Sequence, residues 1–120
     1  MKRLVIESPY AGDVEDNIEF ARVVCLYAIY LGYAPIASHL LYTQFLDDDI
    51  QEERMLGIEA GLAWSSQAEE VWFCLQEGAK LSKGMSLAMD RYTELQMNYS
   101  IKYFTWDGMD LNEVDSDAKS

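Results

Sequence analysis

The stretch EEVWFCL, residues 69–75, is the part of this 120-residue chain that decides its fold. After its two glutamates, valine, aromatic and other apolar residues follow one another without interruption. Such a run is typical of a strand that is buried on both faces, as in parallel sheets covered by helices on both sides. The stretch therefore predicts the central strand of an α/β domain.

Three shorter apolar runs predict the other strands, over residues 3–8, 33–38 and 101–106. The dipeptide Ser-Pro ends the first of these runs, as expected where a strand passes into a loop. Pro35 lies in the second run and has no N–H to donate to a neighbouring strand. The second strand is therefore expected at an edge of the sheet, or the proline at the start of the strand.

Three amphipathic helices are expected between these strands. In the first, Asp13 is the expected N-cap, apolar residues recur on one face from Val14 onward, and Gly32 follows the last turn. The second is expected over residues 50–65 and the third over residues 85–97. The side chains of the second helix that are expected to face the core are Met55, Ile58, Leu62 and Trp64. This alternation implies a parallel sheet with right-handed crossovers.

The length of the chain and its hydrophobic half are enough for one core, so we expect one domain over residues 1–106. Residues 107–120 are polar and acidic, and we expect them to form a loosely ordered tail.

The formal net charge of −12 limits the classes of partner. Most of such a surface repels nucleic-acid backbones and anionic membranes, so neither is an expected partner. Two interpretations of the acidity stay open. It can simply keep a small protein soluble, or it can imitate a polyanion and attract a protein that binds nucleic acid.

The two cysteines, Cys25 and Cys74, both lie inside apolar runs, which predicts two buried free thiols in a reducing cytoplasm. The first ten residues do not form a signal peptide, and no run approaches the roughly 18 apolar residues of a membrane span. A cytoplasmic location is therefore expected. The chain has one histidine and no paired cysteines, so we expect no metal and no cofactor.

Ligands of open parallel sheets bind beyond the carboxyl ends of the strands. This rule selects the loops at residues 8–13, 38–49 and 75–84. The first loop reads SPYAGD, and its backbone N–H groups before a helix could hold a phosphate or a sugar hydroxyl. It matches neither a dinucleotide fingerprint nor a P-loop, and an ordinary capped turn explains it equally well. Its candidate ligand-binding residues are Ser8, Pro9, Tyr10 and Gly12.

The second and third loops supply the remaining candidates. His39 follows a predicted strand and should lie at the rim of the crevice, although a lone histidine is more often a structural hydrogen-bonding group. The acidic run at Asp47 and Asp48 could bind a hydroxylated ligand or cap the next helix, and Arg54 could pair with these acids or with an anionic ligand. Nothing in the sequence forms a Ser-His-Asp triad or a Cys-His pair. The third loop contributes Ser82, Gly84 and Met85 at the start of a helix.

Five segments in this order resemble the nucleoside 2-deoxyribosyltransferase-like superfamily, in particular a small branch found in bacteria and phages. The segments are IESPYAGDVEDNIEFAR (6–22), GYAPIASHLLYTQFLDDD (32–49), ERMLGIEAGLAW (53–64), EEVWFC (69–74) and SKGMSLAMD (82–90). The resemblance covers residues 3–106. It implies a flavodoxin-like three-layer sandwich with a four- to five-stranded, mainly parallel sheet. It also implies a nucleoside or nucleotide pocket at the strand ends and a homodimer or larger homo-oligomer.

The resemblance also implies a specific loss. In the transferases, a glutamate near the start of the helix after the third strand attacks C1′ of the sugar. Relatives of this chain carry the pattern S-x-G-M-x-x-E there, whereas this chain has Ala88 at the position of the glutamate. A methyl group is neither a nucleophile nor a base. Asp90 lies about 200° around the helix and Glu94 roughly 9 Å along it. Glu77, followed by Asp47 and Asp48, is the better-placed substitute.

Three functions remain open from the sequence. The first is a nucleoside- or nucleotide-binding protein without transferase activity, which in a phage could sequester a nucleotide signal. The second is an N-glycosidase or deoxyribosyltransferase that uses Glu77 or a loop aspartate. The third is an acidic module that binds another protein.

Overall fold

The computed structural model describes residues 1–114 and has a sheet with the strand order β2-β1-β3-β4-β5. The first four strands run parallel, and β5 runs antiparallel to β4. The strands are β1 (Lys2–Glu7), β2 (Tyr33–Ile36), β3 (Glu70–Gln76), β4 (Tyr99–Trp106) and β5 (Leu111–Val114). The predicted α/β class and mainly parallel sheet are confirmed, and β2, which contains Pro35, is an edge strand as expected.

The predicted helices are present with small shifts at their ends. They are α1 (Val14–Tyr30), α3 (Gln51–Ser65) and α4 (Lys83–Glu94). Asp13 caps α1 by accepting a hydrogen bond from the backbone N–H of Asp16, and Ser82 caps α4 in the same way. Gly32 follows α1 with a φ of +94°, a conformation that glycine adopts without strain.

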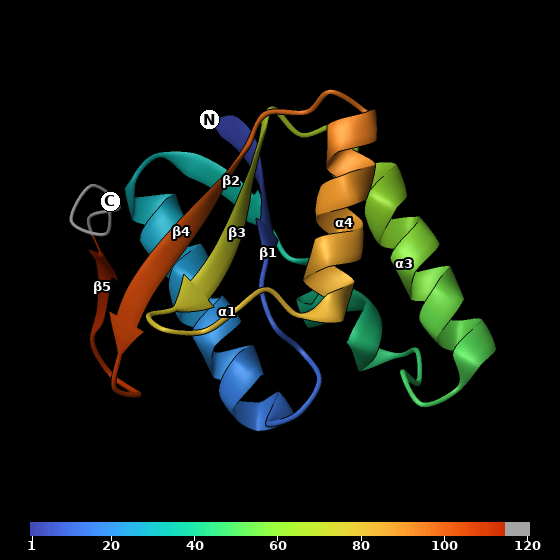
Figure 1. The fold of residues 1–120 in the computed structure, drawn as a ribbon, viewed down its shortest axis with the longest axis horizontal. Coiled ribbons are helices and arrows are strands. Elements are labelled where there is room, and N and C mark those ends of the chain that lie inside the picture. Colours follow the sequence, from blue (N-terminus) through green and yellow to red (C-terminus); the bar gives the residue numbers. More distant parts are fainter. Residues whose placement is uncertain (115–120) are drawn as a thin grey trace.

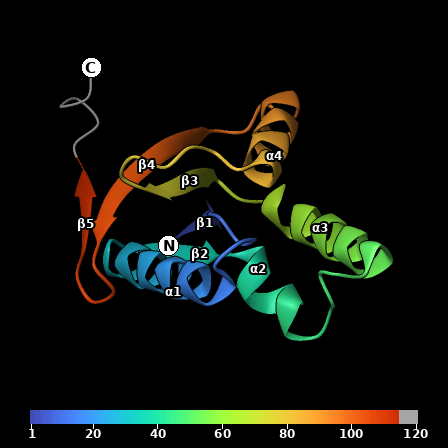
Figure 2. The same cartoon turned by 60° about the horizontal axis from the view of Figure 1, so that its bottom comes forward.

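Helices cover both faces of the sheet, which gives the three layers of a flavodoxin-like fold. Helix α1 lies on one face and α4 on the other, while α3 lies next to α2 and α4 at the side of the sheet (Figures 1 and 2). The carboxyl ends of the four parallel strands point to the same edge, where α1 and α4 begin (Figure 1).

Strand β3 is the centre of the core, as its sequence predicts. Trp72 and Cys74 point into a cluster with Phe20 and Val24 of α1. The alternating residues Val71, Phe73 and Leu75 point to the opposite face of the sheet, into a second cluster. Each residue from 71 to 75 is at most 2% exposed, so β3 is buried on both faces. The second cluster consists of Val5, Val71, Phe73, Leu75, Met85 and Tyr92.

The structure corrects three expectations. The expected loop at residues 39–49 begins with the short helix α2 (Ser38–Leu41) and the 3-10 turn η1 (Tyr42–Gln44). The expected loose tail contains strand β5, while residues 115–120 lie outside the described part of the chain. In α3, Gly61 and Ser65 are buried, whereas Met55, Ile58 and Trp64 are 46% to 65% exposed. Leu62 alone of the four predicted residues packs against the core.

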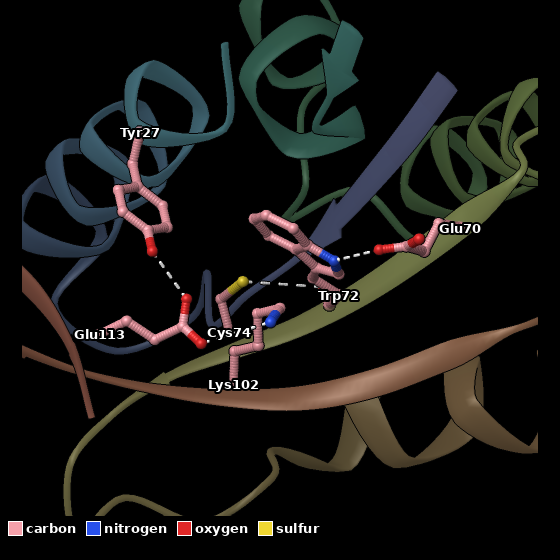
Figure 3. Close-up of polar contacts among 6 residues, drawn as sticks. All are labelled: Tyr27, Glu70, Trp72, Cys74, Lys102 and Glu113. Carbon is pink, nitrogen blue, oxygen red and sulfur yellow. Dashed lines mark hydrogen bonds and ion pairs between the residues drawn. The ribbon is translucent and has the colours of Figure 1, made fainter. Parts of the chain in front are cut away.

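Strand β5 pairs with β4, and a polar network also joins it to α1 (Figure 3). The Tyr27 hydroxyl donates a 2.8 Å hydrogen bond to Glu113, and Lys102 forms a 3.3 Å ion pair with the same carboxylate. The Lys102 ammonium group also lies 4.7 Å from the centre of the Trp72 ring, a distance typical of a cation–π contact. Composition alone gives no sign of these long-range partners.

Both cysteines are free, as predicted, but only Cys74 is buried, whereas Cys25 is partly buried. Desolvation raises the pKa of the Cys25 thiol to about 11 and that of Cys74 well above its usual range. Such thiols stay protonated and unreactive at neutral pH. Within residues 1–114, no helix is long and apolar enough to cross a membrane. The same residues contain no group of three or more acidic, histidine or cysteine side chains arranged to hold a metal ion.

Candidate functional site

The carboxyl ends of β1 and β2 bring the first two candidate loops into contact. The hydroxyl of Ser8, which directly follows β1, lies 3.2 Å from Nε2 of His39 on α2, and the two share a hydrogen bond. The Tyr10 ring meets the His39 ring edge-on at a centroid distance of 5.7 Å. Ser8, Tyr10 and His39, which are separated by up to 31 positions in the chain, therefore form one cluster.

His39 is held as a neutral hydrogen-bonding group. Burial lowers the pKa of its imidazole to about 4, so the ring is uncharged at neutral pH. Thr43 stabilises the turn that carries it, since its hydroxyl donates to the His39 backbone carbonyl. A neutral imidazole can offer one donor and one acceptor to a ligand but cannot attract a phosphate by charge.

The loop after β1 is held by its own side chains. The Asn17 amide donates to the backbone carbonyls of Tyr10 and Ala11 at 3.0 and 3.1 Å. Gly12 has a φ of +96° and no atom near the position of a Cβ, so the turn faces open space. The loop is thereby fixed beside the Ser8–His39 pair.

Two hollows lie along the loop that carries α2 and η1. The first separates the turn after β1 from the acidic loop and is lined by Tyr10, Ala11, Gly12, Val14, Thr43, Leu46, Asp47, Asp48 and Asp49. The second lies between α2, η1 and α3 and is lined by Ser38, His39, Tyr42, Thr43, Leu46, Asp48, Glu53, Arg54, Gly57 and Ile58. Six of the predicted residues, namely Tyr10, Gly12, His39, Asp47, Asp48 and Arg54, thus line one hollow or both.

The acids of this loop are partly engaged in local structure. The Asp47 carboxylate accepts a 2.9 Å hydrogen bond from the Asp49 N–H, and the Asp47 N–H donates to Glu53 of α3. This pattern favours the capping interpretation of the acidic run. Arg54 is exposed and forms no ion pair within the described residues.

The third candidate loop lies at the same edge of the sheet but lines neither hollow. The Ser82 hydroxyl accepts a 3.1 Å hydrogen bond from the Met85 N–H, and Met85 itself is buried in the second core cluster. Gly84 is exposed, with open space around it. Glu77 is exposed on this loop, and its backbone N–H donates to the carbonyl of Phe104.

One buried acid at this edge of the sheet, which lines neither hollow, escaped prediction from the sequence. Glu7 ends β1, immediately before Ser8, and accepts a 2.5 Å hydrogen bond from the hydroxyl of Tyr92 on α4. Burial raises the pKa of Glu7, and this effect outweighs the hydrogen bond from Tyr92, which acts in the opposite direction. The one available signal was a single carboxylate as the last residue of an otherwise apolar strand.

The comparisons with known proteins agree with the fold. The sequence matches the family model described as "Domain of unknown function (DUF7768)" over residues 2–104. Proteins of curated function give no sequence match. A solved structure of the 2-deoxyribosyltransferase from the psychrotolerant bacterium Bacillus psychrosaccharolyticus is similar, with a TM-score of 0.64 and 12% sequence identity, over 88% of this chain and 74% of that chain. That enzyme is described as a biocatalyst for nucleoside synthesis. A similarity at this identity shows a shared fold.

Proposed function

This chain belongs to the DUF7768 family, and we propose that it is a nucleoside- or nucleotide-binding protein that lacks the transferase reaction of its structural relative. The observation that carries the proposal is the cluster of Ser8, Tyr10 and His39 at the carboxyl ends of β1 and β2. This is the edge at which parallel α/β sheets bind their ligands. The fold shared with a deoxyribosyltransferase supports a ligand of the nucleoside class.

The chemistry of the cluster suits an uncharged part of such a ligand. Tyr10 presents an aromatic ring on which a base can stack. The neutral His39 and the Ser8 hydroxyl can exchange hydrogen bonds with sugar hydroxyls. A phosphate would have to be held by Arg54, which lines the hollow behind His39. The candidates Pro9, Gly12, Asp47 and Asp48 surround this region, while Ser82, Gly84 and Met85 belong to the next loop along the same edge.

Calorimetric titration with 2′-deoxynucleosides, ribonucleosides and their 5′-monophosphates tests the proposal. Because base stacking on an aromatic ring contributes about 1–3 kcal/mol, Tyr10→Ala should weaken binding by roughly 5- to 150-fold. Tyr30→Ala is the matched control, since Tyr30 is 84% exposed at the opposite end of α1. Absence of binding by the unchanged protein, or equal losses in both variants, would contradict the proposal.

The loss of the transferase reaction rests on Ala88, which packs on the second core cluster with no reactive group. We expect the purified protein not to exchange bases between deoxynucleosides. Ala88→Glu restores the residue that the family resemblance places there and should produce measurable base exchange, followed by chromatography of the free bases. Exchange by the unchanged protein above a heat-inactivated control would refute this part of the proposal.

Homo-oligomer formation is a second part of the proposal, and α3 supports it. Met55, Leu56, Ile58 and Trp64 are each 46% to 65% exposed on this one helix. A second copy of the chain could bury these side chains. A protein partner would serve equally, so the interaction-module function stays open for this surface.

A further inference from the structure

We propose that Glu7 is the catalytic acid of this site and that it promotes hydrolysis of a nucleoside N-glycosidic bond, acting from strand β1 in place of the missing acid of helix α4. The proposal rests on the proposed function, because it requires a nucleoside at the carboxyl end of β1. It assigns the reaction to a residue other than Glu77 and the loop aspartates, which are the substitutes that the sequence suggested.

The Glu7 side chain points toward α4. Successive residues of a strand point to opposite faces, so Glu7 shares the face of Val5. Val5 packs in the second core cluster with Met85 and Tyr92 of α4. The hydrogen bond from Tyr92 confirms that the Glu7 carboxyl reaches this helix.

Tyr92 and Ala88 lie close together along α4. Ala88 precedes Tyr92 by four residues, so the two side chains lie on the same face of the helix, with Cβ atoms about 5–6 Å apart. Ala88 packs against the same core cluster as Tyr92. The residue that binds the Glu7 carboxyl therefore lies one helical turn from Ala88, the position where the family resemblance implies an acid.

The Glu7 carboxyl group has one hydrogen-bonded oxygen and a raised pKa. Tyr92 is fully buried and occupies Oε2 of Glu7, whereas Oε1 accepts no hydrogen bond from residues 1–114. Glu7 as a residue is only partly buried and lies next to Ser8 at the carboxyl end of β1. A desolvated carboxyl without a cationic partner keeps its proton to higher pH than usual, as a general acid must.

The neighbours of Glu7 do not supply an alternative acid or base. Tyr92 on α4 has a raised pKa and stays a neutral phenol. Ser65, at the end of α3, lies beside the Tyr92 hydroxyl and does not titrate. Cys74 on β3 also responds to the charge of Glu7, and its thiol stays protonated. Glu7 is thus the carboxyl group among these neighbours, and its pKa is raised by burial.

The reaction balances without a cofactor. Glu7 transfers a proton from Oε1 to a nitrogen of the base as the C1′–N bond breaks, and the bonding electron pair stays with the base. A water oxygen adds to C1′, and its proton returns to the Glu7 carboxylate. The sum is nucleoside plus water to free base plus sugar. Tyr92 holds the carboxyl in place and is a positioning residue.

The test measures free base released from 2′-deoxyadenosine and from other nucleosides, together with binding by calorimetry. A general acid contributes typically 10²–10⁴-fold, so Glu7→Gln should lower the release rate by at least about a hundredfold while binding persists. Glu94→Gln is the control, since Glu94 is an exposed acid of α4, the helix that carries Tyr92. Tyr92→Phe removes a hydrogen bond that lowers the pKa of Glu7, so the fall of the rate with rising pH should move to higher pH.

The outcomes separate the two proposals. Binding without release by the unchanged protein would overturn the role of Glu7 and leave the nucleoside site intact. Neither binding nor release would overturn both. Release that survives Glu7→Gln and disappears in Glu77→Gln would assign the acid to the loop instead. A Glu7→Gln protein that binds nucleoside also shows that its loss of activity is not a failure to fold.

Discussion

At the scale of single residues, the site is defined by polar groups that the fold has removed from water. Glu7 is the last residue of β1, and His39 lies on α2, just after β2. Burial lowers the pKa of His39 and raises that of Glu7, so both side chains are shifted toward their uncharged forms. A binding site built in this way favours hydrogen bonds and stacking over charge. Such a preference for uncharged ligand groups agrees with the net charge of −12, because a surface of this charge repels a highly phosphorylated ligand.

The titration of His39 can be observed directly because the chain has one histidine. Its pKa should be about 4 in the folded protein, whereas exposed histidines titrate near 6.5. The unfolded chain binds the proton more readily, so this residue's contribution to stability is complete above about pH 6.5 and is lost as the pH falls toward 4. NMR of the imidazole resonances against pH measures the midpoint. A midpoint near 6.5 would show that the ring is not buried.

Glu7 should influence stability in the opposite direction. Its raised pKa means that the folded state holds the proton more tightly than the unfolded state, so stability is lost as the pH rises through the folded-state value. Glu7→Gln removes this ionisation, so the variant should unfold at a higher temperature than the unchanged protein near pH 8. The difference should shrink toward pH 4. Calorimetric scans at both pH values measure it, and an equal shift at both would exclude the charge as its cause.

At the scale of elements, the packing of α2 against α3 positions His39. Gly61 of α3 lies so close to α2 that an added Cβ would be 2.9 Å from the Cβ of Ser38. Ser38 precedes His39, so a displacement of α2 moves the imidazole away from Ser8. Gly61 therefore helps to position His39, although it has no side chain.

Gly61→Ala should consequently destabilise the protein, even though alanine favours helix by about 1 kcal/mol over glycine. Overpacking costs about 1–3 kcal/mol, which equals or exceeds that gain. Gly57→Ala is the matched control in the same helix, where the added Cβ would meet the flexible end of Leu46 at 3.4 Å. Chemical denaturation of both variants, with nucleoside titration, checks the prediction. A Gly61→Ala protein as stable as Gly57→Ala would contradict the tight contact.

At the scale of the whole molecule, α3 leaves most of its large apolar side chains exposed. It contacts mainly α2 and η1, and its buried residues are Gly61 and Ser65. The helix lies at the side of the sheet next to α4 and α2 (Figure 2), and Met55, Leu56, Ile58 and Trp64 are 46% to 65% exposed. Association of two copies through this helix would complete its burial.

Trp64→Glu should therefore weaken self-association of the protein without unfolding it, because Trp64 is 65% exposed. Light scattering coupled to size-exclusion chromatography measures the mass of both proteins at several concentrations. Leu87→Glu on α4, where Leu87 is 60% exposed, is the control for a change of charge alone. A monomeric unchanged protein would refute the homo-oligomer.

The sequence by itself determined the four parallel strands, the three longer helices, the N-cap Asp13 and the central place of β3. These features follow from local patterns of apolar residues and from capping groups within a few positions of one another. The same patterns identified Ser8, Tyr10 and His39 through the rule for strand ends. They also assigned the wrong face to α3, because helical periodicity cannot show that a helix lies beside the sheet rather than on it.

The tertiary structure alone decided what depends on contacts between distant segments. Tyr92 is 85 positions from Glu7, and Glu113 is 86 positions from Tyr27, so neither pair can be read from local spacing. The first pair singles out one acid among the 21 acidic residues of the chain. The second pair joins α1 to β5, which lies in the segment that was expected to be a loosely ordered tail. Burial, which sets the protonation of Glu7 and His39, is a property of the packed molecule and has no counterpart in the order of its residues.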